Sequence, residues 1–253
     1  MLSHALTCSD LARIKHLSYN VSRDDPSATK TNELLQTEVR KDPDCPLFRI
    51  LPNLEQLRHL ELGVSATVGG GDSTTTGQPV IHPSWTSEDL FPFRDSLSSL
   101  TLHVPAVDHS VLLFASIFAH DLDVLSLVLS DRDVVSLDRA ACARLAFPSL
   151  RHLSLRSESP TANVDVVRNL APTTFPRLEL LSIEVAPSNA DSARGPGEAA
   201  DDLLAALPNM LKVWTSREAG RLAHVSLRLS PADRPVVERL RLAFEGVAID
   251  LIE

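Results

Sequence analysis

Two ten-residue stretches of the chain are near-copies of each other: Phe147-Pro-Ser-Leu-Arg-His-Leu-Ser-Leu-Arg156 and Phe175-Pro-Arg-Leu-Glu-Leu-Leu-Ser-Ile-Glu184. They agree at the Phe-Pro pair, at the apolar positions of a Leu-x-x-Leu-x-Leu pattern, and at the serine between the last two apolar residues. Self-similarity at a regular spacing is the sequence signature of a repeat architecture. The pair therefore predicts a fold built from stacked copies of one structural unit.

The same pattern recurs along the whole chain. Its fourth position is occupied by Leu17, Leu60, Leu100, Leu125, Leu153, Leu181 and Val225. The three central intervals are 25, 28 and 28 residues, whereas the outer ones are 43, 40 and 44 residues. The central spacing matches the roughly 20–29 residues of a leucine-rich repeat, in which each unit is a strand followed by a helix. The longer intervals each contain an insertion, so the repeat is regular in the middle and irregular toward both ends.

These units predict an α/β fold, a leucine-rich-repeat-like solenoid with a parallel sheet of about seven or eight strands on the concave side and helices on the convex side. Residues 1–253 are expected to form one domain, because a solenoid grows by adding units rather than by enlarging one core. Besides the seven patterned strands, we expect an eighth at 247–251 and helices at about 32–41, 110–120, 138–147, 164–170, 198–218 and 235–244. Flexible insertions, rich in residues that have little to bury, are expected at about 65–83 and 187–197.

The overall charge and the cysteines narrow the classes of function. A net charge of −9, a pI near 5.5 and the lack of a Lys/Arg cluster argue against nucleic acid and an anionic membrane surface as partners. Cys8, Cys45 and Cys142 are too widely spaced for a disulfide framework or a zinc knuckle. The N-terminus lacks the order of a signal peptide, and the apolar run 111–119 is too short to cross a bilayer. We therefore expect a cytoplasmic or nuclear protein without a cofactor.

The patterned strands, most clearly Phe-Pro-Ser-Leu-Arg-His-Leu-Ser-Leu at 147–155, resemble the degenerate leucine-rich repeats of fungal F-box proteins. The resemblance extends over most of the chain. Proteins of that family carry an N-terminal F-box that docks the Skp-type adaptor of a cullin ubiquitin ligase, and their repeats hold the substrate. The resemblance thus implies a protein-binding module, in the role of substrate receptor of an F-box-like ubiquitin-ligase adaptor. Because only ten residues precede Leu11, where the first repeat begins, a Skp-type adaptor is expected as a partner only if an F-box lies upstream.

Alternate residues of a strand point to the same side of a sheet, so the residues between the leucines are expected to form columns across neighbouring strands. The middle column contains Ser18, Glu61, Thr101, Ser126, Ser154, Ser182 and Ser226. Two residues earlier the column contains His16, His59, Ser99, Val124, His152, Leu180 and His224, and two residues later Asn20, Gly63, His103, Val128, Arg156, Glu184 and Arg228. From these columns we predict a partner-binding surface of His59, Glu61, Thr101, His103, Ser126, Val128, His152, Ser154, Arg156, Ser182, Glu184 and Arg228.

The columns allow a plain interpretation and a functional one. Small β-compatible residues suit a crowded inner face, so the hydroxyl column is either a packing feature or a polar recognition strip. The last column mixes charge, size and polarity, and it is where we expect specificity to lie. Seven strands at about 4.8 Å spacing give a face of roughly 29 Å, which suits a protein partner better than a small substrate.

Neither a catalytic site nor a metal site is predicted. His16 and His59 are expected to approach each other, with Glu61 further along the face, but no close ligand spacing accompanies them. His152 and Ser154 share a face without a third group that would orient the imidazole. The chain also lacks the Gly-x-Ser-x-Gly and Gly-x-Gly-x-x-Gly motifs, so we do not expect an enzyme.

The alternative is a doubly wound α/β enzyme, hydrolase-like, with an unrecognised site and with strands that only imitate repeats. Such a fold would place a glycine-rich loop directly after a strand and at the start of a helix. The run that begins at Gly69 is followed by Ser, Thr and Pro rather than by a helical pattern. The sequence therefore favours the binding module.

Overall fold

The computed structural model describes residues 13–19, 54–63, 91–104, 107–129, 135–137, 139–142, 144–157, 173–185, 222–228 and 247–251, with shorter pieces at 166, 207–208, 211–212, 214, 237–238 and 241–242. Its main feature is one parallel sheet of eight strands, which lie side by side in the order in which they occur along the chain. The strands are β1 (His16–Tyr19), β2 (His59–Gly63), β3 (Ser99–Val104), β5 (Val124–Leu129), β7 (His152–Ser157), β8 (Leu180–Val185), β9 (His224–Arg228) and β10 (Ala248–Leu251).

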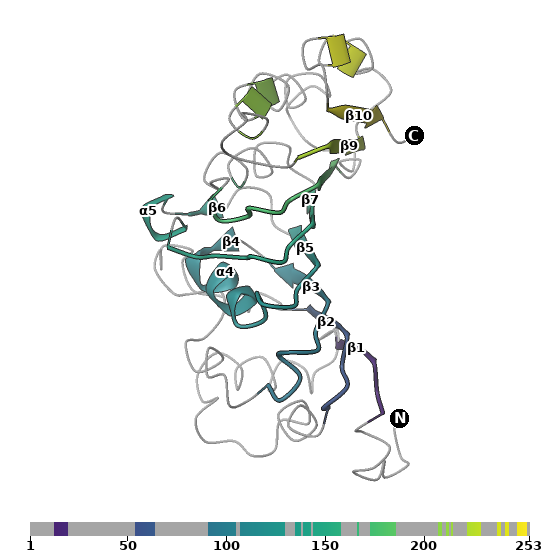
Figure 1. Ribbon diagram of the computed structural model, residues 1–253, viewed down its shortest axis with the longest axis vertical. Helices are drawn as coiled ribbons and strands as arrows, with labels where there is room; N and C mark the ends of the chain where they lie inside the picture. Colours follow the sequence, from purple (N-terminus) through teal and green to yellow (C-terminus); the bar gives the residue numbers. More distant parts are fainter. Residues whose placement is uncertain are drawn as a thin grey trace, which may run out of the picture.

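The strands are stacked along the long axis of the molecule, and the described helices lie on one side of them (Figure 1). These helices are α4 (His109–Ser116) and α5 (Arg139–Cys142), and a small parallel pair, β4 (Val107–Asp108) with β6 (Val135–Ser136), lies beside them. The column of strands is bowed, so that β1 and β10 lie farther to the right in Figure 1 than β5 does. The result is an α/β fold whose sheet does not close on itself and whose helix-free side is concave.

The leucines that define the sequence pattern form two columns on the helix side of the sheet. The register pairs each with its equivalent on the next strand. Residues with 3% or less of their surface exposed are Leu60, Leu100, Leu125, Leu153, Leu181, Val225 and Ile249 in one column, and Leu62, Leu102, Leu127, Leu155, Ile183 and Leu227 in the other. Because full burial of a leucine stabilises by about 1.5–3 kcal/mol, these shared columns hold the strands together.

The first leucine of each pattern lies in the turn before its strand rather than in the strand itself. Leu57, Leu97, Leu122, Leu150, Leu178 and Leu222 are all buried, and each precedes its strand by two residues. The backbone hydrogen bonds between this leucine and its strand also recur from one strand to the next. The carbonyl of Arg58, for example, accepts hydrogen bonds from the N–H groups of both Ser98 and Ser99, at 2.9 and 3.0 Å. The same arrangement recurs at the carbonyls of Lys15, Ser98, Asp123, Arg151 and Glu179.

An aromatic cluster fills the space beneath the first half of the sheet. The ring of Phe91 lies edge-on to those of Phe93, Phe114 and Phe118, with centroid separations of 5.7, 5.7 and 5.3 Å. All four rings are fully buried. Two of them belong to α4 and the turn that follows it, so the cluster attaches this helix to the sheet.

The helix α4 begins and ends at identifiable residues. The Asp108 carboxylate accepts a hydrogen bond from the N–H of Val111 at 3.1 Å, which caps the helix. The N–H of Ile117 bonds to the carbonyl of Phe114, three residues back, so the α-helix tightens and ends there, short of residue 120. The predicted helix 138–147 likewise stops early, at Cys142, because the N–H of Phe147 bonds to the distant carbonyl of Thr174 at 2.8 Å.

A second group of aromatic rings packs in the second half of the molecule. The rings of Phe147 and Phe175, which open the two near-copies, stack with centroids 5.0 Å apart. Phe175 also stacks on Trp214 at 6.2 Å. The match between the two Phe-Pro pairs in the sequence thus has a structural reason, because equivalent rings of successive units lie against each other in the core.

The predicted eighth strand and the seven patterned strands are present, but they begin later than predicted. The patterned strands begin later because the first leucine of the pattern, such as Leu57 or Leu97, lies in the turn before the strand. The short sheet of β4 and β6 was not predicted. Helical residues are found within the predicted helices at Val166, Leu207, Leu211, Val237 and Arg241. The predicted helix 32–41 and the predicted insertions at 65–83 and 187–197 lie outside the described residues.

Candidate functional site

All twelve residues of the predicted binding surface lie on the concave, helix-free side of the sheet, called here the open face. Its middle column is Ser18, Glu61, Thr101, Ser126, Ser154, Ser182, Ser226 and Asp250, one residue per strand. The column that starts with His16 lies on one side of it. The column on the other side was predicted to start with Asn20, which is outside the described residues, and its first described member is Gly63. Ser226 is buried, and the other middle-column side chains are half-buried or exposed. The predicted register is therefore confirmed.

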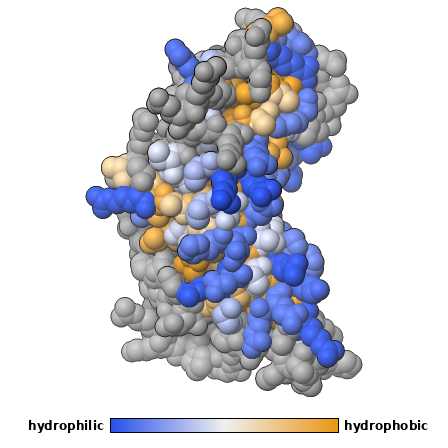
Figure 2. Space-filling view, viewed as in Figure 1, coloured by the Kyte–Doolittle hydropathy of each residue, from blue (hydrophilic) through white to orange (hydrophobic). Residues whose placement is uncertain are grey.

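The space-filling view shows the open face from the side, along the right-hand edge of the molecule (Figure 2). Hydrophilic residues follow the right-hand side of the molecule in Figure 2, and the outline is hollowed at mid-height. The apolar side chains of the open face are few and central: Val124, Val128 and Leu180 are half-buried. The open face is thus a mostly polar strip with a small apolar part near its middle.

Imidazoles and one carboxylate occupy the N-terminal part of the open face. The rings of His16 and His59 are stacked with centroids 4.2 Å apart, which confirms their predicted approach. Partial burial lowers the pKa of His59, and the neighbouring His16 and Arg58 lower it further. The ring of His59 therefore favours the neutral form near pH 7.

Glu61 is paired across strands. Its Oε1 lies 2.7 Å from Nε2 of His103 on the next strand. Hydrogen bonds from His103 and from the Ser18 hydroxyl lower the pKa of Glu61, against the opposing effect of burial. The carboxylate is therefore held charged and in a fixed position.

His152 contacts a serine, but it is not the one that shares its strand. Its Nε2 lies 3.0 Å from Oγ of Ser182 on the neighbouring strand. Alternate residues of one strand are about 6.6–6.8 Å apart, whereas adjacent strands are about 4.8 Å apart, so the cross-strand hydroxyl is within reach and that of Ser154 is less so. Burial lowers the pKa of His152, with Asp123 acting in the opposite direction.

A neutral imidazole beside a hydroxyl is one component of nucleophilic catalysis. Acyl transfer also needs N–H donors aimed at the developing oxyanion. Around Ser182, the backbone N–H groups of β7, β8 and β9 belong to the hydrogen-bonded ladder of a parallel sheet. His152 and Ser182 thus form a polar contact between β7 and β8 on the open face.

Arg156, Glu184 and Arg228 lie side by side on β7, β8 and β9. Nε of Arg156 is 3.7 Å from Oε1 of Glu184, and Nη1 of Arg228 is 3.2 Å from the same oxygen. The arginine side chains are 53% and 54% exposed, whereas that of Glu184 is 26% exposed. The carboxylate thus sits deeper and holds two guanidinium groups that extend into solvent.

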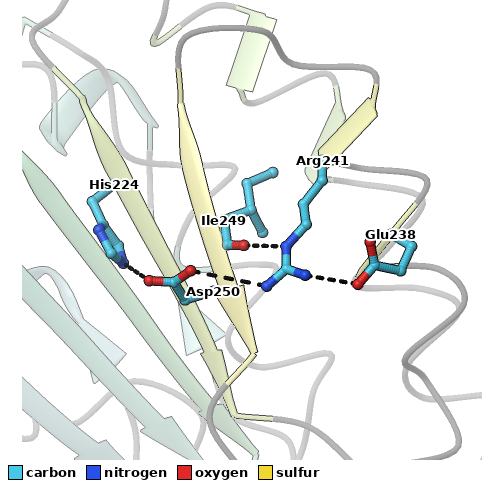
Figure 3. Close-up of polar contacts among 5 residues, drawn as sticks. All are labelled: His224, Glu238, Arg241, Ile249 and Asp250. Atoms are coloured by element: carbon cyan, nitrogen blue, oxygen red, sulfur yellow. Dashed lines mark hydrogen bonds and ion pairs between the residues drawn. The ribbon is translucent and has the colours of Figure 1, made fainter.

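The C-terminal end of the open face is joined to the helical residues Glu238 and Arg241, which lie between β9 and β10 in the sequence (Figure 3). Nε2 of His224 lies 3.0 Å from Oδ2 of Asp250, and Nη2 of Arg241 lies 3.9 Å from the other carboxylate oxygen. Arg241 also donates through Nε to the carbonyl of Ile249 and pairs with Glu238 at 2.7 Å. Arg241 therefore covers the edge of β10, the last strand of the sheet.

Sequence reasoning missed Asp250 and Arg241. Asp250 continues the middle column in the eighth strand, so the pattern Val247-Ala-Ile-Asp-Leu251 carried a signal for it. Arg241 carried no such signal, because its contacts run from a predicted helix to the sheet and not along a column of strand residues. Among the described residues, no group of three or more His, Cys, Asp or Glu side chains is placed to hold a metal ion.

No protein family, curated protein or solved structure matches the chain. None of the helices in the described part of the chain combines the length and apolar character that crossing a bilayer requires.

Proposed function

We propose that this chain is a leucine-rich-repeat-like solenoid that serves as a protein-interaction module and binds a protein partner on the open face. The observation that carries the proposal is the continuity of this face, on which two columns run in register across eight strands and the third, in the described residues, across six. At about 4.8 Å per strand and about 3.3 Å per residue, the face measures roughly 34 Å by 17 Å, on the order of 600 Å². This is comparable with the ~800 Å² that each partner contributes to a standard interface.

The distribution of side chains on the open face supports a protein partner. Its middle carries Val124, Val128 and Leu180 among small hydroxyl residues, and the charged side chains of Arg156 and Glu184 lie beside Val128 on the next two strands. Protein interfaces likewise combine apolar contacts with polar and charged groups, among which arginine is enriched. A flat, extended surface of this kind also offers a small molecule little enclosure.

The order of the strands favours this reading over the doubly wound enzyme. A doubly wound sheet reverses its strand order at one point, and its ligand binds in the crevice at that reversal. The sheet described here contains no reversal, since each strand follows its predecessor along the chain. The crevice on which that alternative depends is therefore missing from the described sheet.

The resemblance to F-box proteins suggests a particular form of this function. We propose that the open face holds the substrate of an F-box-like ubiquitin-ligase adaptor in the cytoplasm or nucleus, with a Skp-type adaptor as a second partner if an F-box is present. Mapping the 5′ end of the native transcript and testing its full product for adaptor capture decides this point. Capture supports the ligase role, and its absence with the full product leaves the binding module alone.

The experiment that tests the binding module compares two matched variants. Ser154→Arg places a bulky charge at the centre of the open face, and Leu113→Arg places the same charge on exposed α4, on the opposite side. Each protein, immobilised with wild type as reference, is exposed to a cell extract, and recovered proteins are quantified by mass spectrometry. Thermal melts confirm that both variants are folded.

A specific partner should be recovered by wild type and by Leu113→Arg, and its recovery by Ser154→Arg should fall by about tenfold or more. The same partner, once purified, should bind wild type directly. Recovery that falls with Leu113→Arg and not with Ser154→Arg would instead assign binding to the helical side. Such a result would contradict the proposal.

A further inference from the structure

Among the described residues, one part of the open face carries more positive than negative charge. Arg156 and Arg228 share a single oxygen of Glu184, so three charged side chains carry a net charge of +1. With histidine counted as neutral, the other pairs described on or beside this face carry no positive excess, since Glu61 contacts His103, and Arg241 lies between Glu238 and Asp250. The positive excess is notable because the chain as a whole carries a net charge of −9. A local cation on an acidic protein selects for a local anion on the partner.

The geometry leaves both guanidinium groups able to bind a second carboxylate. Each contacts Oε1 of Glu184 through one nitrogen, at 3.7 Å for Arg156 and 3.2 Å for Arg228. A guanidinium carries five N–H donors, so most of them remain directed elsewhere. Both side chains are more than half exposed, and Glu184 fixes their position from below. The pair is therefore already placed for an incoming anion, which reduces the entropy lost on binding.

An apolar side chain adjoins this cationic pair. Val128 is the register partner of Arg156, and its side chain is half-buried, so part of it faces solvent. Val124 lies four residues earlier on the same strand, about 13 Å away and beyond Ser126, so Val128 is the apolar side chain next to the arginines. A binding segment that reaches the arginines from this strand thus crosses Val128 first.

The spacing of these residues matches an extended peptide. Val128, Arg156, Glu184 and Arg228 lie on four successive strands, so Arg156 and Arg228 are about 5 and 14 Å from Val128 across the sheet. In an extended peptide, side chains two and four residues away on the same side are about 7 and 14 Å apart. A side chain over Val128 is therefore followed, two or four residues later, by one within reach of a guanidinium group.

We propose that the open face recognises an extended peptide segment of a protein partner in which an apolar side chain, bound over Val128, is followed or preceded at two or four residues by Asp or Glu, bound between Arg156 and Arg228. This inference rests on the proposed function and adds the chemistry of the partner. The partner's carboxylate supplies the second anion for the two guanidinium groups.

A displayed library of random linear peptides tests the proposal directly. The full chain serves as target, and peptides that also bind Ser154→Arg are removed, so that those retained depend on the open face. The dissociation constants of enriched peptides are then measured for wild type, for Arg156→Glu and for Arg144→Glu. Arg144 is exposed in the turn after α5, so its reversal changes the net charge equally at a distance from the open face.

Enriched peptides should contain Asp or Glu at two or four residues from an apolar residue. Arg156→Glu should weaken their binding by about tenfold or more, as expected for loss of a charge-assisted hydrogen bond, and Arg144→Glu by less than about twofold. Replacing the peptide's Asp by Asn should cause a similar loss in wild type and little further loss in Arg156→Glu. If Arg156→Glu does not fold, Arg156→Gln is measured in its place.

Two other outcomes separate this inference from the proposed function. In the first, the peptides bind wild type and not Ser154→Arg, but they lack an acidic residue, or Arg156→Glu and Arg144→Glu weaken their binding equally. This result overturns the acidic-segment proposal and leaves the binding module intact. In the second, the library yields binders to a control target, but no peptide selected on this chain loses binding to Ser154→Arg. This result counts against peptide binding on the open face and overturns the inference with it.

Discussion

Replacement of one central leucine provides the most quantitative test of the shared core. Leu127 on β5 has none of its surface exposed, and its register partners are Leu102 on β3 and Leu155 on β7. Leu127→Ala removes most of this side chain and leaves a cavity walled by leucines. Because hydrogen bonding on both sides holds the strands at a fixed spacing, the walls cannot close the cavity easily. We expect a loss of about 3–5 kcal/mol, the upper part of the range for such substitutions.

The matched control is Ser126→Ala on the same strand, which changes a half-buried side chain of the open face. We expect its cost to stay within about 0.5 kcal/mol, as for other surface substitutions. Both free energies of unfolding are measured in urea by circular dichroism and by tryptophan fluorescence, to which Trp214, 4% exposed, contributes. A shared m-value would show that the two variants unfold the same structure.

If Leu127→Ala is too unstable to measure against a total stability of about 5–15 kcal/mol, Ile183→Val in the same column remains measurable. Its expected cost is about 0.5–1.5 kcal/mol. The reasoning would be refuted if Leu127→Ala cost less than about 1 kcal/mol, or if Ser126→Ala cost as much as Leu127→Ala.

Three further predictions concern other parts of the fold. Burial lowers the pKa of His152 below 6.5, so the folded state binds this proton less readily than the unfolded state. The free energy of unfolding should therefore fall as the pH is lowered from about 7 through 6.5. The slope of this free energy against pH should be smaller in His152→Gln. Arg241→Ala should speed hydrogen exchange in β10, because it uncovers the edge of that strand, whereas Leu242→Ala, whose side chain is 82% exposed, should leave exchange unchanged. Phe91→Ala should cost about 3–5 kcal/mol in urea unfolding, since its ring contacts three other buried rings, and a cost near zero would contradict that packing.

The sheet was predictable because its physical basis is periodic. Each strand buries its leucines on one side, so Leu60, Leu100, Leu125 and their equivalents had to align, and this alignment fixed the open face as well. The strand starts were less predictable. The first leucine of each unit is buried from a turn, and burial alone does not distinguish a turn from a strand.

The contacts of the open face were predictable only as far as the columns reach. That His152 meets Ser182 rather than Ser154 depends on the spacing between strands, which a single strand pattern does not reveal. The ion pairs that Arg156 and Arg228 both form with Glu184 follow from the register of β7, β8 and β9. The contacts of Arg241 could not be inferred, because they join a helix to the sheet and the strand pattern does not fix how that helix is oriented.

The most direct test of the central claim is to ask whether a bound partner covers the open face. Cysteines are introduced separately at Ser154 on the open face and at Leu113 on α4, and their alkylation rates are measured by mass spectrometry with and without a partner or selected peptide. We predict that the partner slows alkylation of Ser154→Cys and leaves that of Leu113→Cys unchanged. Equal rates at Ser154→Cys with and without a saturating partner would contradict the claim that the partner binds there.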